Sequence, residues 1–132
     1  MKVFLDTNVW LSATVFAGLC ETLLTACADR GWLVTCTLVR EEAHVVLSRK
    51  FPHLPQALAL FDAAWNEIPR IPDVPEPADD NDRRLLAAAV AADAELFVTG
   101  DKRLLEWKTS GPLRIVTPRE AWIILFAPHL QH

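Results

Sequence analysis

The chain has 132 residues, 52% of them hydrophobic, and carries 13 Lys and Arg against 17 Asp and Glu, a net charge of −4. This length suits one domain with one sizeable core, so we take residues 1–132 as a single domain. The acidic balance argues against a protein that holds nucleic acid through a broad basic surface. It leaves open an enzyme in which metal ions meet the phosphate groups.

Two further features bear on where the protein works. The longest apolar run, residues 9–20, is shorter than the roughly 20 residues that a membrane-spanning helix needs, and no export signal opens the chain. The cysteines, Cys20, Cys27 and Cys36, lack the C-x-x-C spacing and indicate reduced thiols. We therefore expect a cytoplasmic protein without a membrane segment.

Short apolar strands alternate with helices along the chain. Strands are expected at residues 2–5, 32–35, 96–99 and 113–116. Helices are expected at residues 19–28, from Thr37, at about 53–67, from 79–82 to about 92, through Leu104 and Leu105, and at 117–126. Four prolines make residues 69–77 an extended strap. This alternation predicts an α/β protein, a three-layer α/β/α sandwich around a parallel sheet of four or five strands.

Four acids are expected at one edge of this sheet. Asp6 follows the first strand and Asp101 follows the third. The carboxyl ends of parallel strands share an edge, and the crossover helices begin there. Glu42 and Asp82 lie near two such helix starts, so the four carboxylates should converge.

Helical spacing distinguishes these acids from their neighbours. The residues three and four positions from Glu42 are all apolar: Leu38, Val39, Val45 and Val46. Asp82 likewise shares its face with Leu85 and Leu86. Glu41 and Asp80 have mixed or basic neighbours. We expect Glu42 and Asp82 to point inward and the other two to face solvent.

The chemistry of the four acids indicates a metal site. Converging carboxylates repel one another and lose hydration unless a cation joins them. Oxygen ligands alone favour Mg²⁺ or Mn²⁺, and the four histidines are too scattered for a zinc site. The pattern predicts metal-assisted phosphodiester hydrolysis, with the four acids as catalytic residues and metal ligands.

Each acid also has an ordinary structural interpretation. Asp6 and Asp101 can cap the turn or helix that follows them, and one of the acids at 79–82 caps its own helix. An aspartyl phosphotransfer fold with Asp6 as nucleophile is a second alternative. It fits less well, because Asn8 stands where such phosphatases place a second aspartate.

The ordered set of motifs resembles the PIN domain family over nearly the whole chain. The matching segments are residues 3–9, which end a strand with Asp-Thr-Asn; 40–43 with 46–47 and 49–51; 79–82 with 85–87; 98–102, Val-Thr-Gly-Asp-Lys; and 117–120. The resemblance implies a Mg²⁺- or Mn²⁺-dependent ribonuclease, the toxin component of a type II toxin–antitoxin pair. It implies Asp6, Glu42, Asp82 and Asp101 as the metal-site acids, with Asn8 and Thr99 in supporting positions.

Two residues depart from the family pattern. Asn81 stands where the third motif often has an aspartate, and Arg103 stands where many relatives have one. A weaker metal site or a single firmly held ion would follow. Arg103, Lys102 and Arg83 become candidates for contacts with RNA phosphates. A catalytically weak domain that binds RNA or a protein partner without efficient cleavage is the alternative function.

Two apolar features concern partners and the core. The block at residues 123–126, with Leu19, Leu23 and Leu24, exceeds what a small monomer usually buries. It predicts a homodimer or a covering antitoxin peptide. We interpret Trp10 as core filling rather than as a platform for a base.

Overall fold

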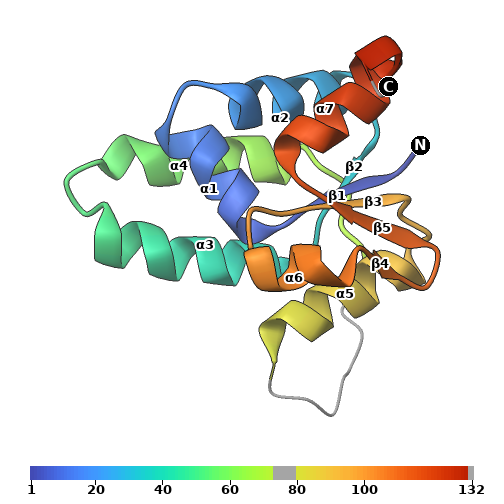
Figure 1. Cartoon of the computed structure of the whole chain (residues 1–132). Helices are drawn as coiled ribbons and strands as arrows, with labels where there is room; N and C mark the ends of the chain where they lie inside the picture. Colours follow the sequence, from blue (N-terminus) through green and yellow to red (C-terminus); the bar gives the residue numbers. More distant parts are fainter. Residues whose placement is uncertain (73–79, 131–132) are drawn as a thin grey trace.

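A five-stranded sheet forms the centre of the computed structural model, which describes residues 1–72 and 80–130 (Figure 1). In this part of the chain the strands are β1 (Val3–Leu5), β2 (Leu33–Val34), β3 (Leu96–Val98), β4 (Thr109–Ser110) and β5 (Leu113–Val116), in the order β2-β1-β3-β5-β4. The first four strands in this order are parallel, and β4 is antiparallel to β5. The predicted parallel sheet is confirmed, with β4 as an antiparallel edge strand that the sequence did not reveal.

Helices cover the sheet on both faces. They are α1 (Thr7–Val15), α2 (Leu19–Asp29), α3 (Thr37–Lys50), α4 (Pro55–Asn66), α5 (Asn81–Ala91), α6 (Lys102–Trp107) and α7 (Pro118–Phe126), followed by a 3₁₀ turn at Pro128–Leu130. Figure 1 shows α2 and α7 above the sheet and α5 below it. The predicted three-layer α/β/α arrangement is confirmed.

The central strands are buried on both faces. Every residue of β1 and β3 is buried, and the rings of Phe4 and Phe97 stack at 5.4 Å between centroids. A continuous apolar run, rather than an alternating one, is typical of a parallel strand with helices on both sides. This rigid pair of strands delivers Asp6 and Asp101 to the carboxyl edge.

Helix α1 was not predicted. It begins directly after Asp6, whose side chain accepts a hydrogen bond from the backbone N–H of Thr7. The helix packs against α2, α3 and α4, and Trp10 is fully buried, with its ring edge-on to Phe61 at 5.5 Å. A helix that is apolar on most sides shows no helical periodicity in sequence. The interpretation of Trp10 as a core residue is confirmed.

The buried stripe of α3 differs from the prediction. Val45 is 51% exposed and Val46 is half-buried, while Ala43 and Leu47 are buried. The inward residues recur every four positions through Val39, Ala43 and Leu47. The two adjacent valines suggested a different face because alanine gives only a weak apolar signal.

The proline strap starts beside the sheet. Thr35 bridges to Arg70 in a parallel sense, with Thr35 N donating to Pro69 O at 3.0 Å and Ile71 N to Thr35 O at 2.7 Å. The predicted extended conformation is therefore found where the strap begins. Pro75 and Pro77 of the strap lie outside the described residues, and so does Asp79 of the helix start predicted at 79–82.

Two predictions from composition can be compared with the structure. Over residues 1–72 and 80–130 no single helix is long and apolar enough to cross a membrane, although α1 and α2, bent by 107°, pass that test as a pair. Within the same residues the three cysteines form no disulfide, and Cys27 and Cys36 are buried. This agrees with the expected reduced thiols.

Candidate active site

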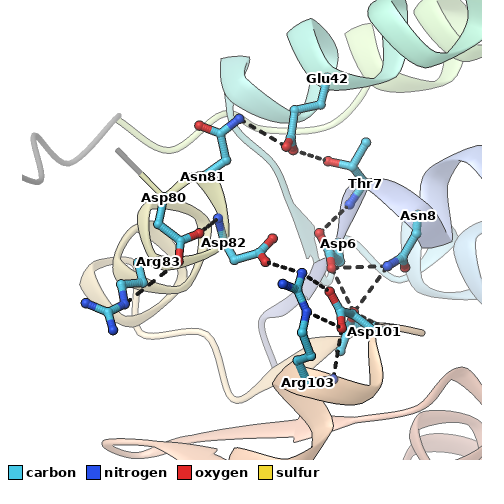
Figure 2. A network of polar contacts seen from close by, with 11 residues as sticks. Asp6, Thr7, Asn8, Glu42, Asp80, Asn81, Asp82, Arg83, Asp101 and Arg103 are labelled. Carbon is cyan, nitrogen blue, oxygen red and sulfur yellow. Dashed lines mark hydrogen bonds and ion pairs between the residues drawn. The ribbon is translucent and has the colours of Figure 1, made fainter. Parts of the chain in front are cut away.

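Four segments bring the predicted acids to the carboxyl edge of the sheet. Asp6 follows β1, Asp101 follows β3, Glu42 lies in the second turn of α3, and Asp82 lies in the first turn of α5. Figure 2 shows the four side chains facing a common region. Parallel strands with crossover helices have this consequence, because strand ends and helix starts share one edge.

Asp6 is the buried acid of the group, at 5% exposure. Its Oδ1 accepts a hydrogen bond from Thr7 N at 2.8 Å, and its Oδ2 accepts one from Thr99 Oγ1 at 2.7 Å. Burial raises the pKa of Asp6 to about 6, against the lowering effect of those two hydrogen bonds, and the charges of Asp82 and Glu42 raise it further. At neutral pH this carboxylate is ionised at a free-energy cost that a bound cation would relieve.

Asn8 and Thr99 connect the ends of β1 and β3. Asn8 Nδ2 lies 3.3 Å from both Asp6 Oδ2 and Thr99 Oγ1, and Asn8 Oδ1 accepts a hydrogen bond from Gly100 N at 3.1 Å. Thr99 Oγ1 also accepts one from Asp101 N at 3.0 Å. These bonds hold Asp101 in a fixed relation to Asp6.

Glu42 is held between α1 and α5. Its Oε1 accepts a hydrogen bond from Thr7 Oγ1 at 2.6 Å, and its Oε2 accepts one from Asn81 Nδ2 at 3.2 Å. As predicted, Glu42 is half-buried and Glu41 is exposed. The sequence reasoning missed Thr7 and Asn81 as partners of Glu42, although both lie inside the motifs that carry Asp6 and Asp82.

Arg103 lies between the other two acids (Figure 2). Its Nη2 is 3.1 Å from Asp101 Oδ2 and 3.4 Å from Asp82 Oδ2. Hydrogen bonds from Arg103 lower the pKa of Asp101. The pKa of Asp82 is raised, first by burial and then by the charges of Asp80 and Asp101. One cationic group therefore already offsets part of the repulsion among the acids.

Three aspartates at this edge also cap helices. Asp6 caps α1, Asp80 caps α5 by accepting from Asp82 N at 2.9 Å, and Asp101 caps α6 by accepting from Arg103 N at 2.9 Å. The structural interpretation of Asp6 and Asp101 as caps is thus confirmed. A carboxylate has about four lone-pair sites, so capping leaves Asp6 and Asp101 able to accept further ligands.

The donors fit a hard divalent cation by their chemistry. Carboxylate oxygens from four segments are the ligands that Mg²⁺ and Mn²⁺ prefer, and the burial of Asp6 favours a cationic partner. As the side chains stand, no three His, Cys, Asp or Glu residues among those described lie close enough to hold one ion. Metal binding would therefore require these side chains to move closer together.

The basic candidates for RNA contacts occupy different places. Arg103 lies within the site and Lys102, just before it, is exposed. Arg83 is 63% exposed and pairs with Asp80 at 3.9 Å, and Figure 2 shows it pointing away from the four acids. Arg103 is thus nearer than Arg83 to the four carboxylates.

The raised pKa of Asp6 predicts that the metal-free protein loses stability as the pH rises. The folded chain binds this proton more tightly than the unfolded chain, whose pKa is near 3.8, so the loss occurs between about pH 4 and pH 6. A shift of this size corresponds to about 3 kcal/mol. The raised pKa of Asp82 likewise lowers the stability as the pH rises. The lowered pKa of Asp101 has the opposite effect, because it raises the stability as the pH rises, and this effect lies below pH 4.

Urea unfolding in EDTA at pH 4.5 and pH 7 measures this loss. Asp6→Asn should remove most of the difference between the two pH values. An equal difference in the wild type and the variant would contradict the assignment to Asp6.

Comparison with known proteins identifies the family. A family model described as PIN domain matches residues 2–103, a span that contains all four acids, Asn8, Thr99 and Arg103. Searches of curated proteins and of solved structures gave no match. The match covers more than half of the chain, and the sheet order and flanking helices have the α/β/α arrangement expected from the motifs. The chain therefore belongs to the PIN domain family and has a nuclease-type fold.

Proposed function

We propose that this protein is a ribonuclease that depends on Mg²⁺ or Mn²⁺, with the metal held by Asp6, Glu42, Asp82 and Asp101. The observation that supports this proposal is the convergence of four carboxylates from four segments at the ligand-binding edge of a PIN domain. Bound there, the ion supplies Lewis acidity and lowers the pKa of a water molecule for attack on phosphorus. Residues 1–132 would act as one nuclease domain.

The surrounding residues have positioning roles in this proposal. Thr99 and Asn8 orient Asp6, and Thr7 and Asn81 orient Glu42 through the hydrogen bonds described above. Lys102 and Arg103 supply positive charge beside the acids for the RNA phosphates. The acidic net charge is compatible with RNA, because a divalent ion would reverse the local charge where the phosphate arrives.

Metal removal tests this function directly. The purified protein should cleave a labelled single-stranded RNA in buffer with Mn²⁺ or Mg²⁺, stop when EDTA is added, and recover with excess Mn²⁺. Asp29→Asn, an exposed acid at the far end of α2, should behave as the wild type in all three conditions. Cleavage that continues in EDTA would contradict the metal mechanism.

The biological role that we propose is the cytoplasmic toxin of a type II toxin–antitoxin pair. The support for this role is an apolar surface on α7 and near the start of α2 that remains partly exposed. Residues 122–126 of α7 are only half-buried, and Leu19 and Phe16 are 41% and 61% exposed. Leu23, which we expected to contribute, is fully buried, because α2 turns it toward the core. An antitoxin peptide or a second copy of the chain would cover this surface.

A second candidate is a domain that binds RNA or a protein partner without efficient cleavage. It is favoured by the guanidinium of Arg103 between Asp82 and Asp101. It is also favoured by Asn81, which contacts Glu42 as a hydrogen-bond donor rather than adding a carboxylate. RNA binding with no cleavage at any Mn²⁺ concentration would support this candidate over the ribonuclease.

A further inference from the structure

One nitrogen of Arg103 contacts two of the four acids at once. Arg103 Nη2 lies 3.1 Å from Asp101 Oδ2 and 3.4 Å from Asp82 Oδ2. Arg103 Nε makes a further contact with Asp101 Oδ1 at 3.4 Å. Asp82 belongs to α5 and Asp101 precedes α6, so this guanidinium joins two separate segments rather than neighbours on one helix.

The two oxygens that contact Arg103 Nη2 belong to two of the acids that would hold a metal ion. Asp82 and Asp101 would have to turn carboxylate oxygens toward a metal ion in order to hold it. The guanidinium nitrogen, 3.1 Å from Asp101 Oδ2 and 3.4 Å from Asp82 Oδ2, stands on the side of both oxygens where an ion shared by the two carboxylates would compete with it. Two positive charges at this spacing would also repel each other strongly.

Arg103 is free to leave this position. Its side chain is 81% exposed. Asp101 caps α6 by accepting a hydrogen bond at Oδ1 from the backbone N–H of Arg103, at 2.9 Å, and this bond does not depend on the Arg103 side chain. The guanidinium can therefore swing into solvent without disturbing α6. It is then available to a phosphate group next to the acids.

We infer that Arg103 is an internal counter-cation that competes with the divalent metal for Asp82 and Asp101 and thereby lowers the metal affinity of the site. This inference rests on the proposed metal-dependent function. In the absence of metal, Arg103 offsets the repulsion between the two carboxylates. Metal binding displaces the guanidinium, so the site fills at a higher metal concentration than the four acids alone would require.

Metal binding to the RNA-free protein tests this inference. Isothermal titration calorimetry with Mn²⁺ should show about tenfold tighter binding to Arg103→Ala than to the wild type, because one positive charge next to the ion is removed. Arg103→Lys keeps the charge but not the shared contact, and should bind with an intermediate affinity. Arg83→Ala is the matched control, since it removes the same charge from a residue that pairs only with Asp80 in the described structure.

The outcomes separate this inference from the proposed function. The inference is overturned if Arg103→Ala binds Mn²⁺ no more tightly than the wild type while Asp101→Asn weakens binding; the metal site then stands. It is also overturned if Arg83→Ala tightens binding as much as Arg103→Ala, since the loss of one positive charge from the protein would then explain both results. If neither the wild type nor Arg103→Ala binds Mn²⁺ at millimolar concentration, the proposed metal site fails together with the inference.

Discussion

Replacing Asp6 by asparagine is expected to reduce metal-dependent RNA cleavage about a thousandfold. A bound ion stabilises developing charge by several kcal/mol, and Asp6 is the one buried carboxylate at the site. An amide has one acceptor oxygen where the carboxylate has two. It would still accept from Thr7 or from Thr99, but would bind a hard cation poorly.

The same variant should be at least as stable as the wild type in EDTA at pH 7. Burial of the charged carboxylate raises the pKa of Asp6 to about 6. Removing that charge should increase the free energy of unfolding by about 3 kcal/mol. The loss of one hydrogen bond to the second oxygen costs roughly 1–2 kcal/mol. The gain exceeds the cost.

Cleavage rates and urea midpoints must be measured on the same preparations. Asp29→Asn is the matched control, an exposed acid for which both values should equal those of the wild type. Lost activity together with a much lower urea midpoint would contradict a ligand role for Asp6 and indicate a structural one.

Trp10→Ala is expected to have the largest effect on stability, a loss of about 3–5 kcal/mol in the free energy of unfolding. Trp10 is fully buried, packs against Phe61, and lies in the helix that begins at Asp6. Its Nε1 has no hydrogen-bond partner among the described residues, so the loss arises from packing. The cavity would also loosen Thr7 and Asn8, which orient Glu42 and Asp6.

Urea unfolding with Trp107→Ala as the control measures this effect. Trp107 ends α6 and is 48% exposed, so its removal should change stability by less than about 1 kcal/mol. Equal losses for the two variants would show that α1 does not contribute to the core as described.

The sequence predicted the parallel sheet because its strands are short and bounded by polar turns. Residues 3–5 before Asp6 and residues 96–98 before Thr99 are apolar throughout, which is the pattern of strands covered on both faces. Helix α1 escaped prediction because its apolar residues surround the helix and show no periodicity. Strand β4 is only two residues long and has no apolar side chain to reveal it.

The placement of the four acids was also predictable, because it follows from topology alone. Strand ends and helix starts meet at one edge whatever the side chains do. The contacts among the side chains were not predictable in the same way. The bond from Thr7 to Glu42 and the position of Arg103 between Asp82 and Asp101 depend on rotamers, which residue spacing does not determine.

The most direct test of the metal-site nuclease is the rate of RNA cleavage as a function of Mn²⁺ concentration, with the wild type and Asp6→Asn on the same labelled single-stranded RNA. The wild-type rate should rise from zero in EDTA to a plateau as Mn²⁺ is added, and the rate of Asp6→Asn should stay at background throughout. Equal rates for the two proteins, or no cleavage by the wild type at any Mn²⁺ concentration, would contradict a nuclease centre built on Asp6, Glu42, Asp82 and Asp101.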